Sequence, residues 1–265
     1  MSIAPFIAFL VALGLVAGTF GGLLGLGGSI LLVPVLTMVF GFPMAIAVGT
    51  GLLCVVATSC AAASVYVERG WADVRLGMLL ELATVLGAIS GALVMPLLSE
   101  TLLKGLFGAF MLYAAVLLWR RPPGESEEVG ETLPGYRVRN RALGTGVCYG
   151  VGSVSAMLGI GGGPIQVPLM YLGMGVPLKM AAATSSFLMG MTAAAGALIY
   201  YGRGQVMVAL TAPLVVGVFL GAQLGSRLAH RVRSRWVHVL LILVLLALAV
   251  MMLGEAFGFS LRGSA

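Results

Sequence analysis

Two glycine clusters interrupt long apolar stretches of the chain and expose backbone groups that can bind a ligand. The clusters supply the first candidate binding residues: Gly27, Gly28, Ser29, Gly161, Gly162 and Gly163. Glycine lets the chain turn sharply, and a helix that begins after such a turn has N–H groups without intrahelical partners. These N–H groups favour an anion. Tight helix packing is the alternative role of glycine, and it fits best Gly14, Gly18 and Gly22, which are spaced four residues apart.

Neutral hydrogen-bond donors near the clusters extend this candidate site. Thr50 and Thr184 occupy equivalent places early in the apolar segments that follow, and Ser185 comes next to Thr184. Gln166 is the most polar residue of the short segment after the second cluster. Hydroxyl and amide groups can donate to anion oxygens without adding charge. The alternative is that each hydroxyl bonds to the backbone of its own helix.

Glu81 is a carboxylate inside an apolar segment. An intramembrane carboxylate is a functional candidate, and we interpret Glu81 as a carrier for a coupling proton. Val215 stands at the equivalent place in the second half, so a position near the membrane interface is the alternative. No Lys or Arg lies clearly within an apolar segment, which leaves neutral donors and helix ends to hold an anion.

The composition predicts an integral membrane protein made of helices. The 265 residues are 60% hydrophobic and 9% charged, with a mean hydropathy of +1.10, whereas soluble domains are about 25% charged. Continuous apolar runs of about 20 residues, such as 207–226, are typical of transmembrane helices and lack the alternation of a barrel strand. The three cysteines form no metal-ligand pattern, so neither a metal nor a cofactor is expected. The basic residues cluster at segment ends, which argues against nucleic acid as a partner.

The chain contains an internal duplication with an offset of 134 residues, for instance from Leu24 to Leu158. Without a gap, 23 of the 69 residues in 24–92 are identical to their equivalents in 158–226. The identities include glycines, prolines and the pair Arg69 and Arg203, which a shared apolar composition does not align. Self-similarity at a fixed offset is the sign of a repeat architecture.

Each half contains the same series of predicted segments. These are a long arm (3–22; 142–158), a short arm (30–40; 165–174), two full spans (45–67 and 74–98; 180–201 and 206–228) and a last span (102–119; 236–254). We therefore divide the chain into a first membrane repeat at 1–119, a polar linker loop at 120–141 and a second membrane repeat at 142–265. The linker carries prolines and five arginines, as a loop does.

The distribution of Lys and Arg favours two inverted halves over two parallel ones. Basic residues prefer cytoplasmic loops. If the long and short arms together cross once, nine basic residues lie inside and six outside. If the arms turn back instead, the halves are inverted, and twelve lie inside against three outside: Lys104, Arg203 and Arg262. We expect inverted repeats, each a re-entrant broken hairpin plus three transmembrane helices, with both termini outside and the linker in the cytoplasm.

Inverted repeats with interrupted helices are an architecture of secondary transporters, whose site lies where the breaks meet. The leading hypothesis is a secondary transporter of a small anion that works by alternating access. A passive anion channel of the same fold is the alternative. An intramembrane enzyme lacks a nucleophile or metal set, and an assembly subunit would not need paired breaks.

The doubled motif resembles the TauE/SafE family of membrane transporters. The resemblance lies in the run 25–29 with Val33-Pro34 and Gly49-Thr50, repeated at 159–164 with Val167-Pro168 and Ala183-Thr184-Ser185. It covers nearly the whole chain, which departs from the pattern at Gly51, where the second copy has Ser185. The family implies export of sulfite or an organosulfonate across the cell membrane. The expected partners are that anion, the lipid bilayer, a coupling ion (H⁺ or Na⁺) and a second copy of the chain in a homodimer.

Overall fold

The computed structural model describes residues 3–25, 27–120, 141–228 and 235–257, and the regular structure in these ranges is helical. The first half contains α1 (Ile3–Leu24), α2 (Ser29–Pro34), α3 (Met44–Glu68), α4 (Val74–Val94) and α5 (Glu100–Trp119). The second half contains α6 (Arg141–Leu158), α7 (Gly163–Pro168), α8 (Leu178–Gly202), α9 (Val208–Leu228) and α10 (Arg235–Ala256). Two π-helical turns, Val35–Val39 and Leu169–Gly173, extend α2 and α7, and a 3₁₀ turn, Met95–Leu97, extends α4.

Turn residues set where the long helices begin. Pro43 and Pro177 precede α3 and α8 with φ near −52°, and neither residue needs an N–H there. Gly41 and Gly175 provide the left-handed backbone just before them. Asp73 caps α4, because its carboxylate accepts a hydrogen bond from the N–H of Leu76 at 3.0 Å.

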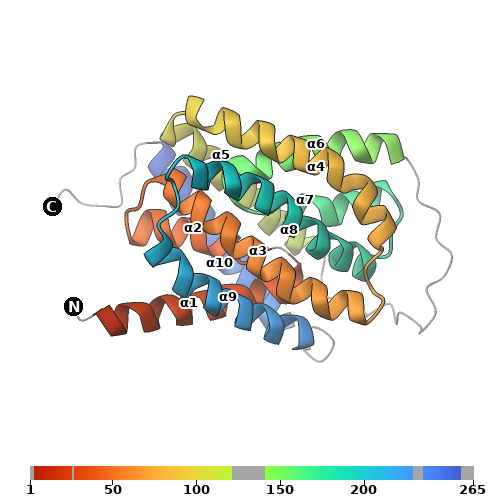
Figure 1. Ribbon diagram of the computed structural model, residues 1–265, viewed down its shortest axis with the longest axis horizontal. Helices are drawn as coiled ribbons and strands as arrows, with labels where there is room; N and C mark the ends of the chain where they lie inside the picture. Colours follow the sequence, from red (N-terminus) through yellow and green to blue (C-terminus); the bar gives the residue numbers. More distant parts are fainter. Residues whose placement is uncertain (1–2, 26, 121–140, 229–234, 258–265) are drawn as a thin grey trace.

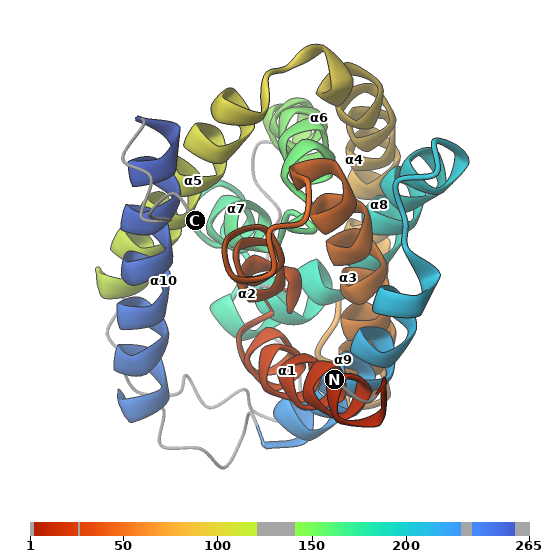
Figure 2. The ribbon, with the colours of Figure 1, turned by 90° about the vertical axis from the view of Figure 1, so that its left-hand side faces the viewer.

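The two short helices lie inside the bundle. Figure 2 shows α2 and α7 at the centre, with α5 and α10 on one side, α4 and α6 on the next, and α1 and α9 below. Every residue of α2 is buried, which agrees with this interior position. Short helices inside a membrane bundle place the ends of their backbone ladders within the protein rather than in lipid.

Helices of each half pack against helices of the other half, and these contacts are reciprocal. Helix α1 packs along α9, and their repeat equivalents α6 and α4 pack together at the opposite margin (Figure 1). Small residues allow the approach: Gly18 lies against the backbone of Val218, and 134 residues away Gly152 lies against the backbone of Thr84. The same contacts thus recur with the halves interchanged, as in an assembly with a two-fold axis.

Equivalent helices of the two halves run antiparallel where they meet. Along the contact of α3 with α8, Leu52 lies at Gly196, whereas Ser59, further along α3, lies at Gly190, earlier in α8. Helices α5 and α10 also run in opposite directions, because Nζ of Lys104 near the start of α5 is 3.1 Å from Oε2 of Glu255 near the end of α10.

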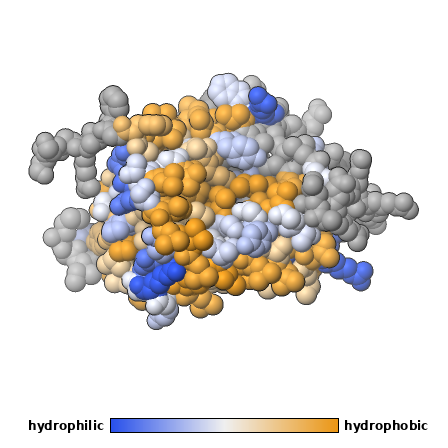
Figure 3. Space-filling view, turned by 90° about the horizontal axis from the view of Figure 1, so that it is seen from above, coloured by the Kyte–Doolittle hydropathy of each residue, from blue (hydrophilic) through white to orange (hydrophobic). Residues whose placement is uncertain are grey.

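The outer surface suits a lipid bilayer. Within the described ranges, five helices are long and apolar enough to cross a membrane: Pro5–Leu23, Met44–Glu68, Val74–Leu97, Met180–Gly202 and Val208–Leu228. Large apolar side chains such as Leu82, Leu198 and Val208 are exposed on them. In Figure 3 apolar side chains cover most of the face, and the hydrophilic ones lie toward its margins. The protein is a multi-pass membrane protein.

The predicted helices are confirmed, with ends that agree to within two residues when the turns that extend α2, α4 and α7 are included. The pattern did not indicate that the second part of each short arm is a π-helix. The α-helical part of each arm ends at a proline, at positions 34 and 168. Because proline has no N–H, the helical hydrogen-bond pattern changes there. Most of the predicted linker, 121–140, lies outside the described residues.

Candidate functional site

The first break lies between α1 and α2 and depends on left-handed glycines. Gly25 and Gly27 have φ of +65° and +78°, a region that other L-residues rarely adopt. Gly28 returns to a right-handed conformation with φ of −67° and precedes Ser29, the first residue of α2. The chain therefore reverses its direction within a few residues, as the glycine cluster predicted.

The second break, between α6 and α7, has the same form with one more left-handed residue. Gly159, Gly161 and Gly162 have φ of +72°, +76° and +77°. Gly162 is left-handed where its equivalent Gly28 is right-handed, so the two breaks differ in detail. Pro164 lies in the first turn of α7, where its missing N–H costs no hydrogen bond.

The two breaks meet near the middle of the bundle. A Cβ at Gly27 would lie 3.4 Å from the carbonyl oxygen of Ile160 in the second break. Val55, at the middle of α3, contacts both breaks, because its methyl groups would lie 3.3 Å from a Cβ at Gly27 and 2.5 Å from one at Gly161. Met189, the repeat equivalent of Val55, lies beside Gly27 as well. Apolar side chains thus fill the space between the breaks.

Polar atoms without partners surround this junction. Oγ of Ser29 and Nε2 of Gln166 are buried, and within the described ranges neither has a hydrogen-bond partner. Nε2 of Gln166 would lie 3.5 Å from a Cβ at Gly162, and its Oε1 accepts a hydrogen bond from Oγ of Ser185 at 3.2 Å. Ser155, near the end of α6, adds a second buried hydroxyl of this kind. A buried donor without a partner costs free energy, so such groups are expected where a polar ligand binds.

In each half, one hydroxyl lies where the short helix packs against the long helix that follows it. The short helix carries this hydroxyl in the first half, and the long helix carries it in the second. The first half has Ser29 on α2 and Gly51 on α3, whereas the second has Gly163 on α7 and Ser185 on α8. A Cβ at Gly51 would lie 3.3 Å from Cβ of Ser29 and 2.8 Å from Cγ2 of Val33. In the first half, Ser29 on α2 therefore supplies the hydroxyl that Gly51 on α3 lacks.

Thr50 and Thr184 immediately precede Gly51 and Ser185 in the chain, and their side chains face other helices. Oγ1 of Thr50 is 3.2 Å from Oγ1 of Thr211 on α9, and Oγ1 of Thr184 accepts a hydrogen bond from the N–H of Asp73 at 2.9 Å. One residue is about 100° of helical turn, which separates these hydroxyls from the face that Ser185 presents to Gln166.

Glu81 is buried within the protein, on α4. Its Oε1 accepts a hydrogen bond from Oγ1 of Thr192 on α8 at 3.1 Å, and its Oε2 has no partner within the described ranges. Glu81 thus lies where α4 packs against α8, and its partner Thr192 is about one helical turn from Met189, which borders the first break.

Two tyrosines hold the long arms just before the breaks, and the sequence analysis did not single them out. The hydroxyl of Tyr66 donates to the carbonyl of Gly22 at 2.8 Å, and 134 residues on Tyr200 donates to Ala156 at 3.0 Å. The sequence signal for this role is that a tyrosine stands at both repeat-equivalent positions. Val55 and Ser155 were also missed, since neither residue type stands out in an apolar helix.

A helical membrane protein of two reciprocal halves, with an interrupted helix from each half meeting inside, has the features of a membrane transporter. The model of the sulfite exporter TauE/SafE family matches residues 10–252. The chain belongs to this family, which makes it a membrane transporter and not an enzyme.

Relatives of similar length share the description as membrane transporters. The probable membrane transporter protein YunE of Bacillus subtilis strain 168 is 28% identical over 266 residues, covering 93% of this chain and 97% of that protein. A probable membrane transporter protein of Xylella fastidiosa strain 9a5c is 30% identical over 212 residues, with 79% and 80% covered. The protein MJ0441 of Methanocaldococcus jannaschii is 25% identical over 264 residues, with 92% and 94% covered. No solved structure matches the chain.

Proposed function

We propose that the protein is a secondary transporter that exports a small anion, sulfite or an organosulfonate, by alternating access of two inverted halves. The observation that carries the proposal is the junction of the two glycine breaks, where buried donors of Ser29 and Gln166 have no partner in the described structure. An oxyanion would supply acceptors for these donors. Each such bond to a charged oxygen contributes about 1.5–3 kcal/mol.

Two features of the packing support the inverted arrangement. The equivalent helices α3 and α8 run antiparallel, as expected if the axis that relates the halves lies in the membrane plane. Arg69 and Arg227 line one pocket, which supports the inverted arrangement because it places both arginines on the same side of the membrane. Both termini are then outside, and the linker 120–141 is cytoplasmic because of its arginines.

The proposed site has an inner group of residues and a supporting pair. The inner group consists of the backbone and side chains that surround the junction: Gly27, Gly28, Ser29, Gly161, Gly162, Gly163, Gln166 and Ser185. Thr50 and Thr184 support it, because their hydroxyls join α3 to α9 and α8 to the start of α4.

Val55 and Met189 favour a transporter over a channel. They fill the space between the breaks, so an anion cannot pass until α3 and α8 move apart. A gate that must open by helix movement suits alternating access, whereas a channel needs a continuous polar path. Glu81 is our candidate for a site of proton coupling, with Na⁺ as the other coupling ion and a homodimer as the proposed assembly.

The test is flux into liposomes that contain the purified protein. We expect sulfite and 2-hydroxyethanesulfonate to enter, with an uptake that a proton gradient stimulates and that saturates with concentration. Gly162→Val should abolish the flux, because a β-branched side chain both blocks the left-handed backbone and covers its N–H groups. Gly146→Val, at an exposed position with open space around it, is the matched control. Unsaturable flux at ion-channel rates would favour the channel, and absence of flux with every sulfur oxyanion would refute the proposed substrate class.

A further inference from the structure

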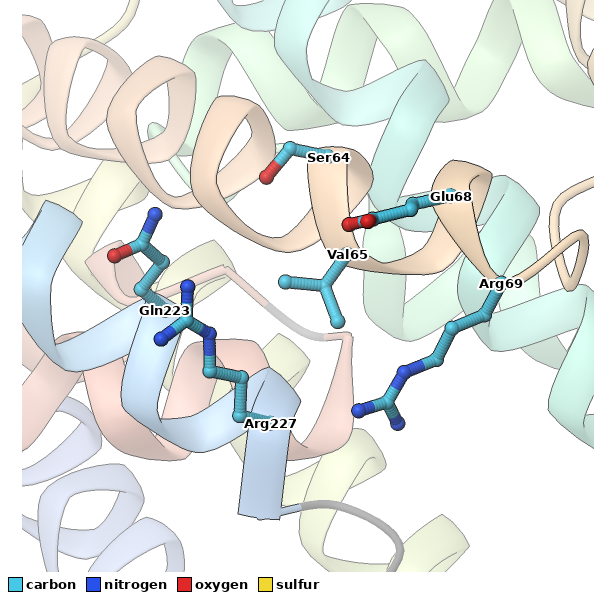
Figure 4. A pocket seen from close by; sticks show the side chains of 6 residues that line it. All are labelled: Ser64, Val65, Glu68, Arg69, Gln223 and Arg227. Atoms are coloured by element: carbon cyan, nitrogen blue, oxygen red, sulfur yellow. The ribbon is translucent and has the colours of Figure 1, made fainter.

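We propose that a pocket at the ends of α3 and α9 is the vestibule where the transported anion first binds on the cytoplasmic side, an inference that rests on the proposed function. The pocket has a volume of about 580 Å³. Figure 4 shows the six residues that line it: Ser64, Val65, Glu68, Arg69, Gln223 and Arg227. Pockets of 300–1,000 Å³ are the usual size for small-molecule sites.

The pocket is an exception to the symmetry of the halves. At the repeat-equivalent positions the polar lining is replaced by residues without a polar side chain: Leu198 for Ser64, Gly202 for Glu68, Ile89 for Gln223 and Leu93 for Arg227. Arg203, the equivalent of Arg69, is turned onto the end of α4 instead, where its guanidinium donates to the carbonyl of Ala92 at 2.7 Å. Duplication therefore does not account for the polar pocket, which belongs to one side of the protein.

The pocket lies next to the first break. Val65 lines it, and the adjacent Tyr66 donates its hydroxyl to Gly22 at the end of α1. On the α9 side Gln223 lines the pocket, and the adjacent Ala222 packs against the same Gly22. The hydrogen bond of Tyr66 thus joins the end of α3 beside the pocket to the end of α1 beside the glycine cluster, and in this proposal it must yield, together with the packing of Val55 and Met189, for an anion to pass.

The side chains of the pocket suit an oxyanion. A guanidinium presents a planar fork of N–H donors that matches sulfonate, sulfite or phosphate oxygens. Arg69 is held by the ring of Trp71, whose centroid is 5.0 Å from its Cζ, while Arg227 has no hydrogen-bond or ion-pair partner in the described part of the chain. In Figure 4 the amide of Gln223 lies beside the guanidinium of Arg227, and together they offer donors from one helix face.

The oxyanion can come from the transported solute or from the phosphate of an anionic lipid. We assign it to the solute, because the neighbours of two lining residues, Tyr66 and Ala222, contact Gly22 just before the first break. Two arginines against one glutamate leave the pocket with a net positive charge, which suits a single small anion.

The test measures binding at the pocket directly. Gln223→Cys, in a chain in which Cys60 is replaced by Ser, is labelled in liposomes with a sulfonate-bearing methanethiosulfonate reagent and with its trimethylammonium counterpart. We expect the anionic reagent to react several-fold faster, methanesulfonate to slow the labelling in proportion to its occupancy, and Arg227→Gln to remove both effects. Arg75→Gln, which removes an arginine outside the pocket, is the matched control and should leave both unchanged.

Flux supplies the second readout. In the chain with native cysteines, Arg227→Gln should lower sulfite flux about tenfold at low concentration and little at saturation, and Arg227→Lys should restore part of it. If phosphatidylglycerol rather than methanesulfonate protects the cysteine, the pocket binds lipid and the proposal is wrong. Protection by neither refutes it as well. Normal flux in Arg227→Gln would refute the vestibule alone, whereas absence of flux in the unaltered protein would refute the proposed function.

Discussion

Substitution of Gly161 by Ala tests whether the second break packs against Val55. The left-handed φ of +76° costs an L-residue about 1–2 kcal/mol. The new Cβ would also lie 2.5 Å from Cγ1 of Val55, well inside van der Waals contact. Overpacking of this kind costs about 1–3 kcal/mol. We therefore expect Gly161→Ala to lower the free energy of unfolding by about 2–5 kcal/mol.

Val55→Ala separates the two costs. It removes both Cγ methyl groups, so the contact with a new Cβ at position 161 disappears while the strain in φ remains. In the double variant we expect a favourable coupling free energy of about 1–3 kcal/mol between the two sites. The residual loss relative to Val55→Ala should then be about 1–2 kcal/mol, the cost of the left-handed backbone alone.

The assay is equilibrium unfolding in detergent micelles for the four proteins of the cycle, together with sulfite flux in liposomes. Gly146→Ala is the control, because Gly146 is helical with open space around it, and it should stabilise by about 0.5–1 kcal/mol. Effects that add to within about 0.5 kcal/mol would refute the reasoning, since they would mean that Gly161 and Val55 do not touch.

Three further predictions concern the breaks, the coupling site and the topology. Gly162→Ala should be more destabilising than Gly28→Ala by about 1–2 kcal/mol in the same unfolding assay, since only Gly162 has a positive φ; equal losses would contradict this. Glu81→Gln should leave the protein folded but make sulfite flux independent of a proton gradient, and an unchanged dependence would remove Glu81 from coupling. In a cysteine-free background, a Cys at Glu100 should react with an impermeant maleimide added outside intact cells and a Cys at Arg75 should not; the reverse pattern would invert the topology.

Much of the fold was predictable from local signals. Helix ends follow from residues with a strong backbone preference, such as Pro43 before α3 and Asp73 at the cap of α4. The breaks follow from glycine clusters in otherwise apolar runs. The duplication then transfers each of these assignments to the second half.

The direction in which each side chain points could not be predicted in the same way. In a helix that is apolar on all sides, no hydrophobic stripe indicates which face meets which neighbour. Residue type alone therefore does not distinguish Thr184, which bonds to Asp73, from Ser185, which bonds to Gln166. For the same reason Val55 was one apolar residue among many, although it contacts both breaks.

The exchange of partners between the halves has a consequence for synthesis. The glycine stripe of α1 contacts α9, and the start of α9 is about 200 residues later in the chain. At the usual 5–20 residues per second of translation, α1 waits on the order of 10–40 s in the bilayer before its partner emerges. During that time α6 can already join α4, because both have been made. The first helix to enter the membrane is thus among the last to find its partner, and the ribosome must nearly finish before the first half is complete.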